Sequence, residues 1–196
     1  EHMEEVSKVK EDFMQLGKKF DINLDIYARE ALSPDGYGIG PLLEIRDVLR
    51  IFERHKDRPV SLEGLAVDMA GRLLELGGVV PQGRGNAMAR AKLENGEAEE
   101  KFWSIAEAQG AEKRLKSSDL HVAQYSHTVK ANRSGVISRI GNKEVVKIAR
   151  SLGAPFIKEA GMYLHKLRGD SVTAGDELVT LYATSSERLE LGMDVM

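Results

Sequence analysis

The sequence of 196 residues contains no cysteine. A chain without cysteine forms no disulfide bond, no thiolate zinc site and no cysteine nucleophile, so each of those protein classes is excluded. It also lacks any apolar run near the roughly 20 residues that a membrane-spanning helix needs. The first 17 residues are charged and amphipathic, which is unlike a signal peptide. We therefore expect a cytoplasmic protein.

An excess of charge of one sign is also nearly absent. Lysine and arginine total 28 and aspartate and glutamate total 31, which leaves a net charge of -3. Nucleic acids and anionic membranes select proteins with a basic stripe, so we expect neither as a partner. Hydrophobic residues make up 42% of the chain, enough for a packed core, and this excludes a wholly disordered protein.

The first region combines a helical pattern with a strand pattern. Apolar residues at steps of three and four predict a helix over Glu4–Phe20, and alternation of apolar and polar residues predicts a strand over Ile22–Ala28. A helix that leads into a strand is half of an α/β unit, which normally has a strand before the helix. We interpret residues 1–32 as the C-terminal edge of a truncated α/β domain. The helix stripe Val6, Phe13 and Leu16 should then be exposed and favour a homo-oligomer.

Residues 33–40 are rich in turn-forming residues and separate this region from the next. We interpret them as a glycine hinge, in which Gly36, Gly38, Gly40 and the following Pro41 permit close packing or a positive φ. The alternative is a phosphate-binding loop at the N-terminus of the next helix. The hinge is favoured because neither the third glycine of a dinucleotide fingerprint nor the Gly-Lys-Ser/Thr of a P-loop is present.

Residues 41–118 predict a helical bundle with short connections. Helical spacing places Leu43, Leu65, Leu73 and Phe102 in its core, and Trp103 is expected to be buried as well. Residues 119–196 predict an α+β domain of short strands with one helix, Asn142–Leu152. The inward residues of that helix are expected to be Val145, Val146, Ile148, Ala149 and Leu152. The fold class is therefore mixed α and β.

The residues that could carry chemistry do not form a recognisable constellation. His55, His121, His127 and His165 lack the helical spacing of a metal site, and no Gly-x-Ser-x-Gly motif supports a serine hydrolase. His165 is expected to pack or to form a hydrogen bond within the small sheet. We therefore assign no catalytic residue and no metal site.

A series of short segments nevertheless occurs in a characteristic order. They are 38–49 (GIGPLLEIRDVL), 73–78 (LLELGG), 93–98 (LENGEA), 108–110 (AQG), 130–136 (KANRSGV), 152–155 (LGAP) and 160–165 (AGMYLH), followed by 169–172 (GDSV) and 175–178 (GDEL). Together they resemble the C-terminal part of the nucleoside phosphorylase family, which contains thymidine, pyrimidine-nucleoside and archaeal AMP phosphorylases. The Gly-Ile-Gly-Pro form points to the AMP branch, and a pyrimidine nucleoside stays open as the alternative substrate.

The resemblance implies reversible phosphorolysis of an N-glycosidic bond, with phosphate as co-substrate and no cofactor. It also implies a hammerhead or barrel-sandwich type of C-terminal domain. The family's phosphate-binding loop and base-binding residues lie upstream of Glu1, so no catalytic residue can be carried over and the chain alone should be inactive. The alternative is a structural or biotinyl/lipoyl-like carrier module. A carrier needs a lysine at a hairpin tip, whereas Lys143 and Lys147 lie in a helical pattern and Lys166 follows a strand pattern.

Overall fold

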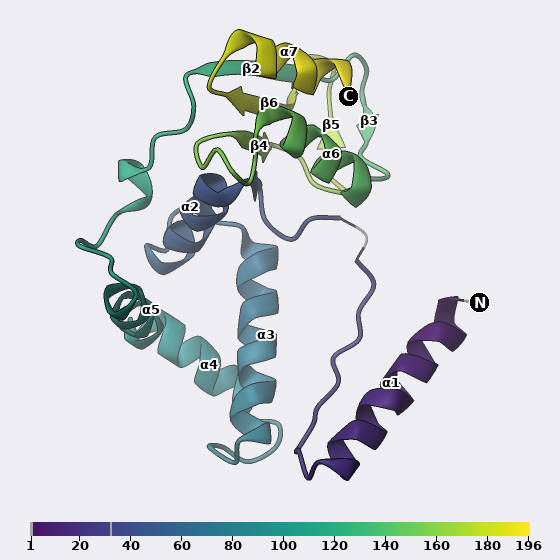
Figure 1. The fold of residues 1–196 in the computed structure, drawn as a ribbon, viewed down its shortest axis with the longest axis vertical. Coiled ribbons are helices and arrows are strands. Elements are labelled where there is room, and N and C mark those ends of the chain that lie inside the picture. The colour runs from purple at the N-terminus through teal and green to yellow at the C-terminus, as the bar shows by residue number, and fades with distance from the viewer. Residues whose placement is uncertain (1, 32) are drawn as a thin grey trace. The chain divides into compact units, whose positions relative to one another are not determined.

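The computed structural model describes residues 2–31 and 33–196 and has a mixed α and β fold, as predicted (Figure 1). Its contacts divide the chain into two compact units, which are Glu1–Glu30 with Gly64–Ala98, and Ala31–Glu63 with Glu99–Met196. The predicted boundaries at residues 32, 40 and 118 stay predictions. No helix in the described part of the chain is long and apolar enough to span a membrane.

The first unit contains α1 (His2–Lys19), most of α3 (Val60–Leu76) and α4 (Gly85–Glu94). Helices α3 and α4 approach closely at Gly71 and Gly85. A Cβ at Gly71 would lie 2.6 Å from the backbone nitrogen of Asn86, so only glycine permits this packing. The predicted helix over Glu4–Phe20 is confirmed as α1, and the predicted stripe Val6, Phe13 and Leu16 is exposed, Phe13 to 54%.

The predicted strand Ile22–Ala28 is wrong, because residues 22–30 form no strand. A strand needs a neighbour for its backbone hydrogen bonds, and the described residues of this unit supply helices instead. The polar side chains of the segment contact α3. Asp25 receives two hydrogen bonds from Arg72, at 2.7 and 2.9 Å, and Asn23 donates to the carbonyl oxygen of Leu76. The alternating pattern therefore reflects a segment that lies along a helix.

The second unit is built on a four-stranded antiparallel sheet in the order β1-β4-β6-β2. These strands are β1 (Gly38–Ile39), β4 (Gly161–Leu164), β6 (Glu177–Ala183) and β2 (Tyr125–Lys130). A separate pair joins β3 (Gly135–Val136) to β5 (Ser171–Val172). The remaining elements are α2 (Pro41–Phe52), α5 (Glu97–Ala108), a 3-10 turn η1 (Ser117–Asp119), α6 (Asn142–Leu152) and α7 (Ser186–Asp194).

The core of this unit lies between the sheet and the helices α6 and α7. Helix α6 has the predicted bounds, and it ends at Gly153 in the left-handed conformation with φ of 117°. Four of its five predicted inward residues are buried, and Val146 is 46% exposed instead. On β4, the side chains of Met162 and Leu164 enter this core, because alternate residues of a strand face the same side.

The predicted helical core is only partly correct. Leu43 is fully buried and Trp103 is 6% exposed, whereas Leu73 is 66% exposed and is therefore not a core residue. On α3 the buried residues are Glu63, Val67 and Gly71, one turn apart along a different face. Gly71 has no side chain, so α4 can approach that face of α3 closely. The apolar periodicity of the sequence alone could not indicate this face.

Candidate functional site

The predicted hinge joins the edge of the sheet to α2. Gly38 and Ile39 form β1, which pairs with β4 opposite Tyr163 and Met162. Pro41 is the first residue of α2, where its missing N–H is not needed for the helix. The structure therefore places Gly36 just before β1, Gly38 in β1, Gly40 between β1 and α2, and Pro41 at the start of α2.

Each of these glycines lies where a side chain would not fit. A Cβ at Gly36 would lie 2.8 Å from Oδ2 of Asp47, and one at Gly38 would lie 2.5 Å from the carbonyl carbon of Leu43. Gly40 has a φ of 117° and lies against the carbonyl group of Ala160. In the described conformation the glycines permit close packing and a positive φ. Movement about the segment stays a prediction.

Asp47 is the polar centre of this packing. Its side chain lies on α2, is 1% exposed, and accepts hydrogen bonds through Oδ2 from the backbone N–H groups of Tyr37 and Gly38, both at 2.7 Å. Its other oxygen, Oδ1, is buried without a hydrogen-bond partner among the described residues. A buried polar atom without a partner costs about 1–3 kcal/mol, and the two backbone hydrogen bonds to Oδ2 act against that cost.

Two arginines one turn apart on α2 surround an aromatic ring of β4. The guanidinium carbon of Arg46 lies 5.1 Å from the ring centre of Tyr163, and that of Arg50 lies 5.7 Å away. Arg50 also donates a hydrogen bond of 3.1 Å to the hydroxyl oxygen of Tyr163. The ring of Tyr37 is tilted against that of Tyr163, with centres 5.8 Å apart. These contacts fix α2 against the outer face of the sheet.

Burial dominates the electrostatics of this cluster. It raises the pKa of the Asp47 carboxyl, although the hydrogen bonds from Gly38 and Tyr37 and the charges of both arginines act in the opposite direction. Burial also lowers the pKa of Arg46, and the neighbouring charge of Arg50 adds to this effect. The pKa of the Tyr163 hydroxyl is raised, again mainly by burial. The cluster is thus a partly dehydrated group of charges and rings.

His165 extends the cluster along β4. Its Nε2 lies 2.8 Å from Oγ1 of Thr180, whose hydroxyl is in turn 2.9 Å from that of Thr128. The prediction of a hydrogen bond within the small sheet is therefore confirmed for this histidine. Burial lowers the pKa of His165, while Glu177, 3.8 Å from Nε2, acts in the opposite direction. A neutral imidazole at neutral pH follows from the lowered pKa.

The backbone donors of the glycine segment already have carboxylate acceptors. Gly38 donates to Asp47, and Gly40 donates to Oε1 of Glu44 at 3.0 Å. A phosphate bound to these N–H groups would have to displace both carboxylates. The described geometry therefore gives no support to the phosphate-loop alternative. Within the described part of the chain, no group of three His, Asp or Glu side chains could hold a metal ion.

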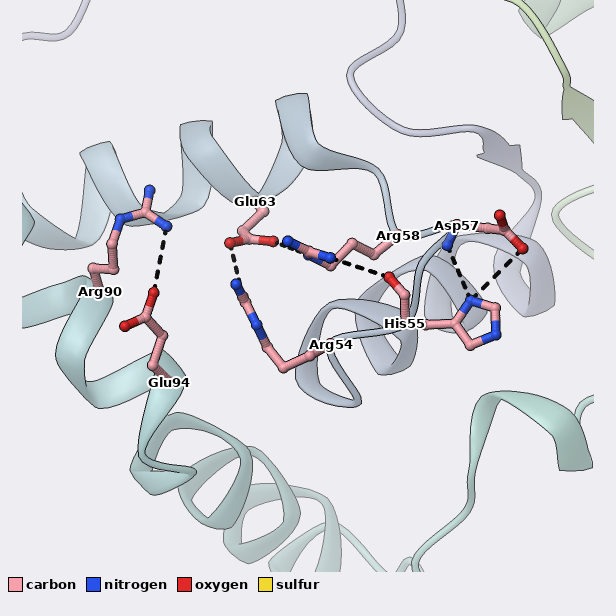
Figure 2. Close-up of polar contacts among 7 residues, drawn as sticks. All are labelled: Arg54, His55, Asp57, Arg58, Glu63, Arg90 and Glu94. Atoms are coloured by element: carbon pink, nitrogen blue, oxygen red, sulfur yellow. Dashed lines mark hydrogen bonds and ion pairs between the residues drawn. The ribbon is translucent and has the colours of Figure 1, made fainter.

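A second polar network joins the end of α2 to the start of α3. Figure 2 shows the carboxylate of Glu63 between Arg54 and Arg58, with Arg54 Nη1 at 2.8 Å from Oε1 and Arg58 Nε at 2.6 Å from Oε2. The side chain of Glu63 is 3% exposed, whereas both arginines are partly exposed. Arg54 itself has a φ of 53°, in the left-handed region. Glu63 thus holds both arginines of the charged run after α2, and Arg58 also donates a hydrogen bond to the carbonyl oxygen of His55.

Sequence reasoning missed the residues that hold these two networks. Asp47 and Glu63 occupy buried positions on helices, where charged residues are rare unless they are paired. Neither acid lies on the apolar stripe that predicts its helix, so the hydrophobic pattern held no signal for these two residues. The carrier alternative gains nothing from the structure, since Lys143 and Lys147 lie on α6 and Lys166 pairs with Asp176.

Comparison with known proteins identifies relatives along nearly the whole chain. Residues 136–196 match the pyrimidine nucleoside phosphorylase C-terminal domain. The AMP phosphorylase of Pyrococcus abyssi is 40% identical over 190 residues, which is 97% of this chain and 38% of that protein. The AMP phosphorylases of Methanosarcina acetivorans and Methanocaldococcus jannaschii are 37% and 36% identical, over 97% and 96% of this chain. The chain spans about 38% of the length of the first of these relatives.

Proposed function

Because this chain belongs by sequence to the nucleoside phosphorylase family, we propose that it is part of an enzyme that cleaves AMP with phosphate. A phosphate oxygen would form a bond to the anomeric carbon of ribose while the bond to N9 of adenine breaks. The electron pair of that bond leaves with adenine, which takes up a proton, and the other product is ribose bisphosphate. The observation that carries this proposal is the 40% identity to an AMP phosphorylase over 97% of the chain.

The described residues support a division of labour within such an enzyme. Phosphorolysis needs several donors that converge on one phosphate, and in this chain the N–H groups of Gly38 and Gly40 are already bonded to carboxylates. We therefore propose that the phosphate-binding donors belong to the portion of the enzyme outside this chain. The chain would supply the β1–α2 connection and the body that moves with it when the site closes.

The test is release of free base, followed by chromatography. The complete phosphorylase should release adenine from AMP in a phosphate-dependent reaction, and the 196-residue chain alone should release none. Thymidine and uridine replace AMP in parallel reactions, since a pyrimidine nucleoside is the alternative substrate. A complete enzyme that acts on none of the three contradicts the proposed function, and turnover by the chain alone contradicts the division of labour.

We also propose that the chain self-associates through α1. Its apolar stripe is exposed, with Val9 at 53%, Phe13 at 54% and Leu16 at 50%, and contiguous exposed apolar surface favours association. Light scattering should give a mass above the 21.7 kDa of one chain. Phe13→Glu should shift that mass toward a monomer, because it places a charge in the stripe. Gln15→Glu, the same charge change at another exposed position of α1, should leave it unaltered. A wild-type chain that is strictly monomeric would contradict this proposal.

A further inference from the structure

The Asp47 side chain joins α2 to the glycine segment, and that segment is in turn bonded to the sheet. It lies on α2, and its Oδ2 receives the N–H groups of two successive residues of the glycine segment, Tyr37 and Gly38. The carbonyl oxygen of Tyr37 accepts a hydrogen bond of 2.8 Å from the N–H of Leu164, the last residue of β4. Tyr37 is therefore bonded to α2 through its N–H and to the sheet through its C=O.

The close approach of the glycine segment to α2 depends on the absence of side chains at Gly36 and Gly38. A side chain at Gly36 would meet the Asp47 carboxylate, and a side chain at Gly38 would meet the backbone of Leu43 in the first turn of α2. The two glycines thus bring the backbone within hydrogen-bond distance of a short acid. Because Asp47 is 1% exposed, water cannot take over the two acceptor positions.

We propose that Asp47 is a positioning residue, which fastens the glycine segment to α2 and fixes the course of the chain where it enters β1. Its effect on catalysis rests on the proposed phosphorylase function. The fastening itself is a property of the described residues and can be tested without activity. Asp47 acts through the segment that it holds and not through contact with a substrate.

The first experiment measures amide hydrogen exchange in the 196-residue chain. Asp47→Ala removes the shared acceptor, so exchange at Tyr37 and Gly38 should accelerate by roughly 10- to 100-fold, the factor that corresponds to losing a hydrogen bond to a charged group. Amides of the β2–β6 ladder provide the internal reference and should change little. Glu44→Ala is the matched control, because it removes an acid of the same helix that bonds only Gly40. Unchanged exchange at Tyr37 and Gly38 in the alanine variant would overturn the proposal.

Asp47→Asn distinguishes the role of the side-chain oxygen as a hydrogen-bond acceptor from the role of its negative charge. Its carbonyl oxygen can receive both N–H groups, and its NH2 group would replace Oδ1, which has no hydrogen-bond partner in the described structure. Exchange at Tyr37 and Gly38 should therefore stay close to that of the wild type. If Asp47→Ala gives no cooperative melt, Asp47→Ser replaces it, because the shorter hydroxyl stays polar but cannot reach both N–H groups. Acceleration in the asparagine variant equal to that in the alanine or serine variant would contradict the acceptor role.

The second experiment uses the complete phosphorylase. In the proposed phosphorylase the glycine segment would set how this chain closes on the site, and misplacement of reacting groups by about 1 Å can lower the rate on the order of 100-fold. We therefore expect kcat to fall to that extent in Asp47→Ala, while KM changes much less. Asp47→Asn should restore most of kcat. If the wild-type enzyme does not act on AMP, thymidine or uridine, the proposed function fails, and the exchange experiment still decides the role of Asp47. If the wild type is active and the alanine variant equals it, the positioning role is wrong.

Discussion

Gly38→Ala should destabilise the second unit by roughly 3 kcal/mol or more. The new Cβ would lie 2.5 Å from the carbonyl carbon of Leu43, which is backbone and cannot rotate away as a side chain could. The first turn of α2 would have to move off β1. That movement would also lengthen the hydrogen bonds that Asp47 receives from Tyr37 and Gly38. Urea unfolding, analysed through its midpoint and slope, measures the free energy of unfolding.

The matched control for this prediction is Gly135→Ala. Gly135 also lies in a short strand of the second unit, and no atom lies within 4 Å of the Cβ that the substitution would add. The same chemical change should therefore alter the free energy of unfolding by no more than about 0.5 kcal/mol. If Gly38→Ala is as mild as this control, the close packing of the β1–α2 connection is not what holds the unit together.

Glu63→Gln should lower the free energy of unfolding at pH 7 by about 2 kcal/mol. The substitution keeps the shape but removes the charge that Arg54 and Arg58 face, and both arginines remain partly exposed, which limits the loss. Burial by itself raises the pKa of Glu63, but the hydrogen bonds and charges of Arg54 and Arg58 outweigh burial, and the resulting pKa lies below the usual value. The charged form is therefore the stabilised one.

The pH dependence of stability follows from the lowered pKa of Glu63. A carboxyl whose pKa is lowered on folding contributes stability above its unfolded pKa, and this stability is lost as the pH falls through the folded pKa. Unfolding curves from pH 7 to pH 3 should thus be flatter for Glu63→Gln than for the wild type. An equally steep loss of stability in acid would show that Glu63 is not the group responsible.

Asp47 should affect the pH dependence of unfolding in the opposite direction to Glu63. Its pKa is raised by burial, in surroundings that include Arg46, Arg50, Tyr37 and Tyr163. Its contribution is therefore present below the unfolded pKa and is lost as the pH rises through the folded pKa. Asp47→Asn should remove that loss and improve stability at neutral pH relative to acid. Asp47 and Glu63, the buried acids among the described residues, thus affect the pH dependence of stability in opposite directions.

The sequence was sufficient where local pattern and packing agree. Helix α6 has a strong apolar stripe and a glycine at its end, so both its bounds and its inward residues could be predicted, apart from Val146. The resemblance to nucleoside phosphorylases is confirmed, because an ordered series of motifs is more specific than any one of them.

The sequence was insufficient where contacts with residues distant in the chain decide the local structure. The alternation over Ile22–Ala28 is compatible with a strand, and only the position of Arg72 on α3 reveals that Asp25 faces a helix. Leu73 belongs to an apolar stripe, yet α3 uses the side that Gly71 leaves open. The buried role of Asp47 could not be predicted from the sequence, since it depends on the approach of a backbone segment ten residues earlier in the chain.

The aromatic packing at α5 has a practical consequence for following these experiments by spectroscopy. Trp103, the only tryptophan of the sequence, is 6% exposed and meets the ring of Phe102 edge-on, with Phe102 in turn against Phe52 of α2. Its emission therefore reports the environment of α2 and α5 in the second unit, whereas circular dichroism averages over every helix. Emission and dichroism should give coincident unfolding curves only if both units melt together. Separated curves would assign the emission transition to the unit that contains the β1–α2 connection.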